Sequence, residues 1–164
     1  MKTLNLGAGT LLKKDCINFD CQIFTRGDLK TDIIGKIEDI TTLFKKDIFD
    51  TILCFHVLEH FTLKAARKML ADCYIILKLH GTLIMEAPDV LGAYALYKND
   101  LPKLMNVLYS DQVQVDAHGD CWSHHFGYTG DTMNKRWNLL DLKSPMLVVD
   151  CHMVAQIVIL ELLE

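Results

Sequence analysis

The feature that most constrains the fold is a strand–helix–strand pattern in residues 49–89. Residues 49–55 are short, mostly apolar and rich in β-favouring side chains, which predicts a buried strand. In residues 63–77, apolar side chains recur at three- and four-residue steps, which predicts a helix that Gly81 ends. Residues 82–87 predict a second strand. A strand, a helix and a strand of these lengths form a parallel crossover, so we expect an α/β fold.

Shorter apolar segments extend this sheet on both sides. Residues 3–6 and 16–19 predict two strands, but residues 10–15 between them are too few for more than about one helical turn. Residues 146–149 and 154–163 predict two closing strands, of which the last returns antiparallel. We therefore expect an open sheet, mostly parallel with an antiparallel last strand, with helices on both faces and a shortened first crossover.

Size and charge narrow the possible functions. A chain of 164 residues, of which 51% are hydrophobic and 23% charged, is expected to form one globular domain over residues 1–164. The net charge of −4 and the absence of a dense Lys/Arg cluster give no support for a nucleic-acid partner. No apolar run reaches the ~20 residues of a membrane helix. The six cysteines form no Cys-x-x-Cys pair, which favours reduced thiols and a cytoplasmic protein.

A glycine turn follows the first predicted strand. Leu6 leads directly into Gly7-Ala8-Gly9, where the backbone can turn tightly and a ligand can approach the main chain. Asp20 ends the second strand eleven residues later. A glycine turn followed by a strand-end acid is typical of sites that hold a nucleoside ribose by its hydroxyls. A lone Gly-x-Gly is also common in ordinary turns, so the remaining motifs decide.

A histidine-rich segment at residues 116–128 is the second candidate site. Its ligand-type side chains match no established zinc spacing, so we expect no metal, although a zinc-like ion remains an alternative. Its aromatic side chains either wall a pocket or pack the loop. The possible ligands are His118, Asp120, Cys121, His124 and His125, and the aromatic residues are Trp122, Phe126 and Tyr128.

Several short motifs share one order and spacing with a known family. They are Leu-Asn-Leu-Gly-Ala-Gly (4–9), Asp20, Asp39-Ile40, Phe49-Asp50, His-Val-Leu-Glu-His (56–60) and Leu-His-Gly-Thr-Leu (79–83). Together they resemble the class I S-adenosylmethionine-dependent methyltransferases over about residues 3–89, most closely the small subgroup with His-Val-Leu-Glu-His after strand four. The resemblance implies a Rossmann-like fold, S-adenosyl-L-methionine as cofactor and S-adenosyl-L-homocysteine as product.

The resemblance also implies roles for residues at the cofactor. Main-chain N–H groups of Gly7, Ala8 and Gly9, after Leu6, would meet the methionine carboxylate. Asp20 would accept hydrogen bonds from the ribose hydroxyls. Asp39 would meet the adenine amino group and Ile40 would line the ring, although Asp39 could simply cap a turn. Phe55 and His56 would lie near the transferred methyl group.

The resemblance divides the chain into three parts. Residues 1–89 would form the cofactor-binding half, residues 90–128 an acceptor-side insertion, and residues 129–164 a C-terminal helix, capped by Thr129, and two strands. The acceptor is expected to be a small molecule, sugar or lipid-like compound that is methylated on oxygen or nitrogen. No Asn/Asp-Pro-Pro-Tyr/Phe sequence follows strand four, which argues against planar amino groups as acceptors.

Catalysis would depend mainly on positioning, because the sulfonium is already a good leaving group. A general base is needed only where the acceptor loses a proton early, and histidine suits that role near neutral pH. The candidates are His56 and then His125; Glu59 and His60 are expected to be caps or structural partners.

Two other functions remain open. The abbreviated connection after Gly9 lacks the usual third glycine, which leaves a catalytically inactive cofactor-binding or interaction module as an alternative. A nicotinamide-dependent oxidoreductase would share the glycine turn and the strand-end acid. It is disfavoured because the chain has no second mononucleotide-binding half.

Overall fold

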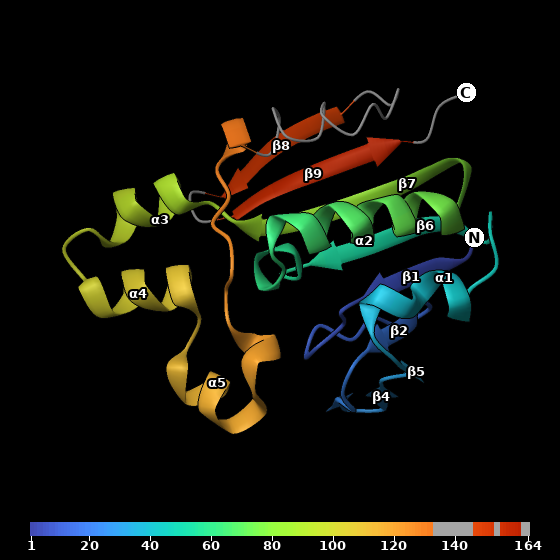
Figure 1. Cartoon of the computed structure of the whole chain (residues 1–164), viewed down its shortest axis with the longest axis horizontal. Helices are drawn as coiled ribbons and strands as arrows, with labels where there is room; N and C mark the ends of the chain where they lie inside the picture. The colour runs from blue at the N-terminus through green and yellow to red at the C-terminus, as the bar shows by residue number, and fades with distance from the viewer. Residues whose placement is uncertain (133–145, 153–154, 162–164) are drawn as a thin grey trace.

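The computed structural model describes residues 1–132, 146–152 and 155–161 (Figure 1). Seven strands form one sheet, and β3 and β4 form a separate antiparallel hairpin beside it. The predicted helix that Thr129 would cap lies almost wholly outside the described residues. The sheet order is β5 (Ile33–Ile34), β2 (Ile17–Asp20), β1 (Thr3–Leu6), β6 (Phe49–Phe55), β7 (Leu77–Pro88), β9 (Ala155–Glu161) and β8 (Met146–His152), and the hairpin joins β3 (Thr25–Arg26) to β4 (Leu29–Lys30).

The pairing of the strands confirms the predicted fold class. Strands β5, β2, β1, β6 and β7 pair in parallel. Strand β9 then runs antiparallel to β7, and β8 pairs antiparallel with β9. The carboxyl ends of the parallel strands therefore meet at one edge of the sheet, where the crossovers leave a crevice for a ligand.

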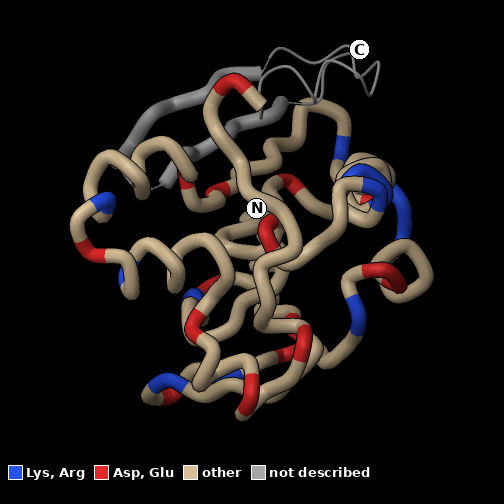
Figure 2. Tube along the Cα trace, turned by 60° about the vertical axis from the view of Figure 1, so that its left-hand side comes forward, with Lys and Arg blue, Asp and Glu red and all other residues tan. Residues whose placement is uncertain are grey.

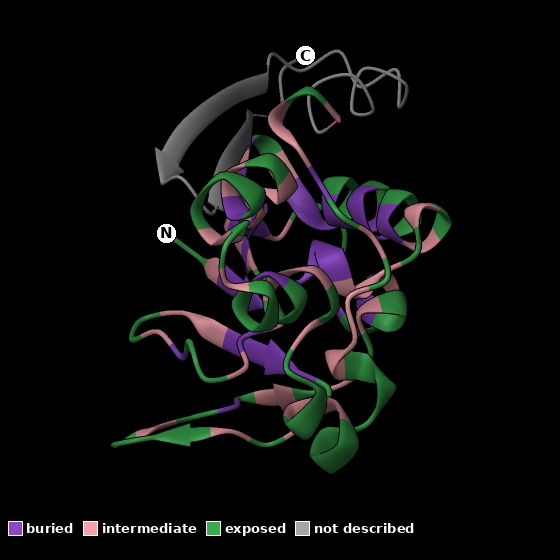
Figure 3. Ribbon diagram, turned by 90° about the vertical axis from the view of Figure 1, so that its left-hand side faces the viewer, coloured by how far each residue is buried: buried purple, intermediate pink, exposed green. Residues whose placement is uncertain are grey.

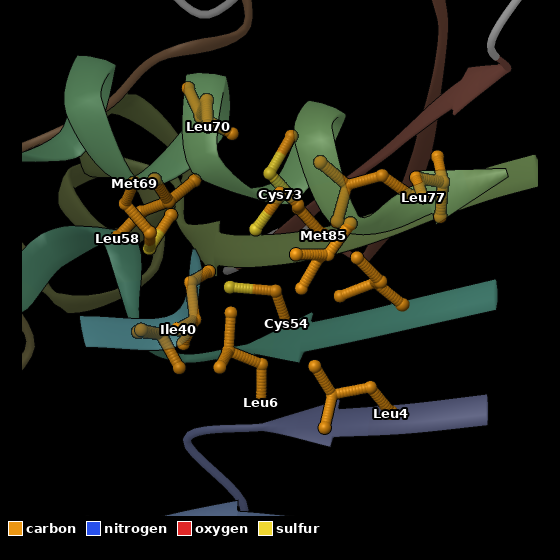
Figure 4. Packing of buried hydrophobic residues seen from close by; sticks show 14 of the residues in the cluster. Leu4, Leu6, Ile40, Cys54, Leu58, Met69, Leu70, Cys73, Leu77 and Met85 are labelled. Carbon is orange, nitrogen blue, oxygen red and sulfur yellow. The ribbon is translucent and has the colours of Figure 1, made fainter. Parts of the chain in front are cut away.

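One face of the sheet carries the hydrophobic core. Helices α1 (Ile40–Leu43) and α2 (Leu63–Ile76) lie side by side against it. The Thr62 side chain caps α2 by accepting a hydrogen bond from the Ala65 N–H at 3.3 Å. Figure 4 shows Met69 and Cys73 of α2 pointing toward the strands. Alternate strand residues meet them, because side chains along a strand point to opposite faces in turn. These include Leu4, Leu6, Cys54 and Met85, all of them buried.

The end of α2 differs from the prediction. The helix ends at Ile76 and β7 begins at Leu77, so Gly81 lies inside the strand and does not end the helix. A Cβ atom on Gly81 would lie 2.7 Å from Leu77 Cγ and 2.8 Å from the Lys78 carbonyl oxygen. The glycine is needed because β7 residues just before it, together with the Asp50 carbonyl oxygen of β6, pack closely against it. A sequence pattern cannot distinguish such a glycine from a helix stop.

The first crossover is short, as predicted. A loop joins β1 to β2, and two paired asparagines, Asn5 and Asn18, hold this loop on the face of the sheet opposite α2. Asn5 Nδ2 donates to the Leu11 carbonyl at 3.0 Å, and Asn18 Oδ1 accepts from the Lys13 N–H at 2.8 Å. Side-chain amides thus provide hydrogen-bond partners for backbone groups of the loop. In a crossover helix, the helix's own backbone would provide them.

Three helices extend beyond the carboxyl ends of the parallel strands (Figure 1). They are α3 (Val90–Tyr97), α4 (Leu101–Tyr109) and α5 (Gln112–His118). All three lie in the segment that the sequence analysis describes as an acceptor-side insertion. Figure 3 shows many exposed residues on these helices and a buried centre in the strands. Single 3-10 turns complete the fold: η1 (Ile37–Asp39), η2 (Leu58–His60) and η3 (Asp120–Trp122).

The charged residues form no dense Lys/Arg cluster in the part of the chain that the structure describes, as the sequence suggests. Figure 2 shows Lys and Arg scattered along the trace and interspersed with Asp and Glu. Within the described residues, no helix is long and apolar enough to cross a membrane.

Candidate active site

A pocket with a volume of about 730 Å³ lies where β1, β2 and β6 end. Five separate segments line it: residues 7–11 after β1, residues 20–24 after β2, residues 36–38 around η1, residues 55–65 after β6, and residues 120–125 after α5. The first four come from the expected cofactor-binding half, and the fifth comes from the expected acceptor side. The pocket therefore joins the two sets of candidate residues that the sequence singles out.

The glycine turn adopts a left-handed backbone conformation that glycine tolerates. Gly7 and Gly9 both have positive φ, at 66° and 47°. A Cβ on Gly7 would lie 2.4 Å from Val57 Cγ2, so this glycine is required by space as well as by conformation. A Cβ on Gly9 would meet nothing within 4 Å, so the main chain at Gly9 borders open space. The turn thus brings a bare stretch of backbone to the pocket wall.

Asp20 is attached to this turn. Its Oδ2 accepts a hydrogen bond from the Gly9 N–H at 2.8 Å, and its Oδ1 accepts from the Gln22 N–H at 3.0 Å. The residue is only 8% exposed but lines the pocket. Each carboxylate oxygen keeps a further lone pair, so the fixed carboxylate can accept two hydrogen bonds from a ligand. The same carboxylate affects the neighbouring thiol, since desolvation and then Asp20 raise the pKa of Cys21 to about 12.

Three of the predicted cofactor residues do not line the pocket. Leu6 and Ile40 are fully buried in the core, and Asp39 lies at the junction of η1 and α1 with no side-chain cap bond. Ile37 and Glu38 line the pocket at this position. The 3-10 turn of η1 places Glu38, one residue before Asp39, on the pocket side. The two adjacent acids could not be told apart from the sequence.

His56 lies in the pocket lining between two carboxylates. Its Nδ1 is 3.3 Å from Glu59 Oε1, and its Nε2 is 3.1 Å from Glu86 Oε1. The hydrogen bond with Glu59 and the charges of Glu59 and Glu86 raise the pKa of His56, against an opposing effect of burial. A neutral imidazole has a single N–H, so it would set a lone pair against one of the carboxylates. The protonated form, which cannot accept a proton, is favoured.

His125 enters the same pocket from the acceptor side. Its Nε2 is 3.4 Å from Asp120 Oδ2. Its backbone N–H donates to the Glu59 carbonyl at 2.7 Å, and the Phe126 N–H donates to the same oxygen at 3.2 Å. The histidine-rich segment is therefore fixed on η2 by its main chain.

The other histidines of this segment separate from one another. His118 stacks on Trp122 with 4.9 Å between ring centroids. His124 points away from this pair: its Nδ1 is 2.9 Å from the Val107 carbonyl, and burial lowers its pKa. The five possible ligands named from the sequence therefore do not converge as a set.

Some lining residues carry no sequence signal, namely Phe24, Lys36 and Phe61, whereas the sequence singles out Trp122 and Cys121. Phe24 and Trp122 are far apart in the chain but face each other with 6.4 Å between ring centroids. Lys36, Phe61 and Cys121 also line the pocket. Their placement depends on the approach of residues 120–125 to the sheet edge, which no local pattern encodes.

Comparisons with known proteins agree with this geometry. Residues 22–85 match a family model described as a methyltransferase domain. This match begins just after Asp20 and includes β6, η2 and α2. No curated protein matches the chain.

Similar solved structures share the fold at low sequence identity. A SAM-dependent methyltransferase from Archaeoglobus fulgidus is 13% identical with a TM-score of 0.64, covering 98% of this chain and 85% of its own. The CurJ carbon methyltransferase is 12% identical with a TM-score of 0.62, covering 100% of this chain and 49% of its own. The small RNA methyltransferase HEN1 is 20% identical with a TM-score of 0.53, covering 77% of this chain and 15% of its own.

The domain match and the shared fold agree with the motifs. S-adenosylmethionine is the cofactor that they imply, and methyl transfer is the activity that they support. Over residues 22–85 the chain therefore matches the methyltransferase domain family, and its fold is that of solved SAM-dependent methyltransferases.

Proposed function

We propose that this protein transfers the methyl group of S-adenosylmethionine to an oxygen or nitrogen atom of a small molecule, such as a sugar or lipid-like acceptor. The observation that carries the proposal is the shared pocket. It holds the glycine turn and Asp20 on one side and the His125–Asp120 pair on the other. A methyl donor and an acceptor must meet in one such space for in-line displacement.

The described residues fit the cofactor. The open space beside Gly9 accepts a ligand against the main chain, and Asp20 is fixed with spare lone pairs for two ribose hydroxyls. Glu38, together with Ile37, replaces Asp39 and Ile40 as the candidate partner of the adenine ring. Bound in this way, S-adenosylmethionine supplies an activated methyl group on a positive sulfur.

The acceptor side is proposed to be residues 90–128. From this segment, the aromatic ring of Trp122 and the imidazole of His125 reach the pocket, and Phe61 lines it from the strand side. Aromatic walls with a few polar groups suit a small organic acceptor. The named relatives include a carbon methyltransferase and a small RNA methyltransferase, so the fold alone does not select the acceptor.

Of the two candidate bases, the geometry favours His125. Asp120 can orient the ring of His125 and stabilise the imidazolium that forms when it takes a proton. His56 lies between two carboxylates, which raise its pKa and favour its protonated form. We propose that His56 contributes positive charge and orientation at the end of β6 and that His125 removes the acceptor proton.

Calorimetry with S-adenosylmethionine and S-adenosylhomocysteine tests the binding step. We expect one molecule of either compound to bind each chain. Asp20→Asn should weaken binding by at least about tenfold, because charge-assisted bonds to the ribose are roughly twice as strong as neutral ones. Asp28→Asn, in the exposed turn between β3 and β4, is the matched control and should bind as the parent does. No heat from a folded sample would contradict the proposal.

A screen of sugar, lipid-like and RNA acceptors with radiolabelled cofactor tests the transfer step. With an acceptor found, His125→Asn should lower kcat by about 100-fold with little change in cofactor affinity. His80→Asn, an exposed histidine inside β7, is the control. Cofactor binding without transfer to any acceptor would favour the inactive binding module. Methylation of RNA alone would overturn the small-molecule assignment.

A further inference from the structure

A cluster of ligand-type side chains lies next to the pocket, and the proposed methyl transfer does not use all of it. Glu59 and His60 belong to η2, and His124 follows η3. One ligand atom from each residue lies within 4.8 Å of the other two. Among the described residues, these three form a group that could hold a metal ion. Two of them follow β6 and the third comes from the expected acceptor side, so the group links the two parts of the chain.

Hydrogen bonds hold both imidazoles with one nitrogen available. His60 Nδ1 is 3.0 Å from the Ser123 carbonyl, and His124 Nδ1 is 2.9 Å from the Val107 carbonyl. A carbonyl oxygen only accepts, so each Nδ1 carries the proton and each neutral ring keeps its lone pair on Nε2. Metal-bound histidines are commonly oriented in this way by backbone carbonyls.

The carboxylate has an unused oxygen in the same place. Glu59 is 2% exposed, and its Oε1 lies 3.3 Å from His56 Nδ1. Its Oε2 is buried and finds no hydrogen-bond partner among the residues that the structure describes. A buried carboxylate oxygen without a partner is costly, and a cation offsets that cost.

We propose that Glu59, His60 and His124 form a binding site for a divalent transition-metal ion of the zinc class. Two imidazole nitrogens and one carboxylate oxygen are a known three-ligand set for zinc, with further positions left open. Imidazole ligands favour zinc over magnesium, which prefers oxygen ligands and retains its waters. His60 also lines the pocket, so the site adjoins the space where the acceptor is proposed to bind.

The ligands are close to the required geometry and are held together by the backbone. Zinc–nitrogen and zinc–oxygen distances of about 2.0–2.2 Å place tetrahedral ligand atoms about 3.3 Å apart. Side-chain adjustments of an ångström or so therefore complete the site. The Glu59 carbonyl accepts from the His125 N–H at 2.7 Å, so the two ligand-bearing segments are already joined.

Zinc titration of the full chain, by competition with a chromophoric chelator and without methyl donor, tests the site. The experiment uses a Cys21→Ser, Cys121→Ser background, because these two interacting thiols of the pocket lining would bind zinc independently. We expect one zinc ion per chain, and Mg²⁺ in excess should not displace it. Glu59→Gln or His124→Gln should weaken binding by at least about tenfold, whereas His80→Asn should not.

Cobalt provides a measurement that does not depend on the stability of these variants. One equivalent of Co²⁺ in the same background should produce visible d–d bands without thiolate charge-transfer bands, and His124→Gln should abolish them. Unchanged zinc affinity in both folded ligand variants would overturn the proposal, as would the absence of a cobalt spectrum. Either result would leave cofactor binding and methyl transfer untouched, because no methyl donor is present.

Discussion

Asn5 and Asn18 are register partners on adjacent parallel strands, and Asn5 Nδ2 donates to Asn18 Oδ1 at 2.9 Å. Both are only 2% exposed. Together they satisfy backbone groups of Leu11 and Lys13, in the loop that leads away from the glycine turn. A side-chain amide pair thus performs, on this face of the sheet, the anchoring that a full crossover helix would provide.

Replacing Asn18 should destabilise the protein and loosen this loop. Asn18→Ala leaves one N–H of the buried Asn5 amide and the Lys13 N–H without a partner, which costs about 1–3 kcal/mol for each unsatisfied group. We expect the free energy of unfolding in urea to fall by about 2–4 kcal/mol in total.

The matched control is Asn99→Ala, in the exposed loop between α3 and α4, which should change stability by less than about 0.5 kcal/mol. A double-mutant cycle with Asn5→Ala should show coupling above about 0.5 kcal/mol. Additive effects of the two substitutions would show that the asparagines act separately.

Gly7 and Gly9 form a matched pair for a test of the turn. Both have positive φ, so alanine at either position costs about 1–2 kcal/mol in conformation. Only at Gly7 does the new Cβ also collide with Val57. Gly7→Ala should therefore lower the unfolding temperature clearly more than Gly9→Ala does.

Cofactor affinity should show a different pattern from stability. Gly9 borders the open space of the pocket, so Gly9→Ala should weaken S-adenosylmethionine binding measured by calorimetry even where the protein remains stable. Equal melting temperatures for the two variants would contradict the close contact between Gly7 and Val57.

Cys21 should be a slow thiol despite its exposed position. Desolvation and the Asp20 carboxylate raise its pKa to about 12, so little thiolate is present at pH 8. Its alkylation by iodoacetamide, followed by mass spectrometry, should accelerate steadily up to pH 10. Asp20→Asn should speed the reaction, because it removes a negative charge that disfavours the thiolate.

The cofactor should also protect this thiol if the pocket is used as proposed. Cys21 lines the pocket and Cys16 does not, so S-adenosylmethionine should slow alkylation of Cys21 while leaving that of Cys16 unchanged. An Asp20→Asn variant that reacts no faster than the parent would show that the carboxylate does not control Cys21.

His56 should make stability depend on pH in a defined direction. Its pKa is raised in the folded state by Glu59 and Glu86, so its contribution is complete below the unfolded value of about 6.5. The contribution is then lost as the pH rises through the folded pKa. The difference in free energy of unfolding between the parent and His56→Asn should therefore shrink as the pH rises above about 6.5.

Asparagine suits this comparison because it tolerates the positive φ of 55° at this position. The measurement should contain a chelator, so that no metal ion competes for Glu59. A difference that stays constant or grows with pH would show that His56 is not held in its protonated form by the two carboxylates.

The parts of the fold that local patterns encode could be predicted from the sequence. The apolar periodicity that begins at Leu63 marks α2, and the run that ends at Phe55 marks β6, because each pattern is a property of consecutive residues. Gly81 shows the limit of this approach. A glycine needed for close packing and a glycine that ends a helix look alike when no neighbours are known.

The candidate site could be predicted only in part, for a similar reason. The glycine turn and Asp20 lie at strand ends, so the topology brings them together. The choice between Glu38 and Asp39 depends on the direction of one 3-10 turn, which the sequence does not specify. The approach of His124 to Glu59 depends on how α4, α5 and η3 fold back, and that is a long-range property.

The histidine-rich segment is attached to η2 through its main chain, which allows its side chains to change without loss of the attachment. The Glu59 carbonyl accepts hydrogen bonds from the main-chain N–H groups of His125 and Phe126. Main-chain bonds survive exchange of side chains, so this anchor does not depend on which residues stand there. Segments of different sequence could therefore be grafted after α5 and still reach the same sheet edge, which makes this loop a natural place to redesign specificity.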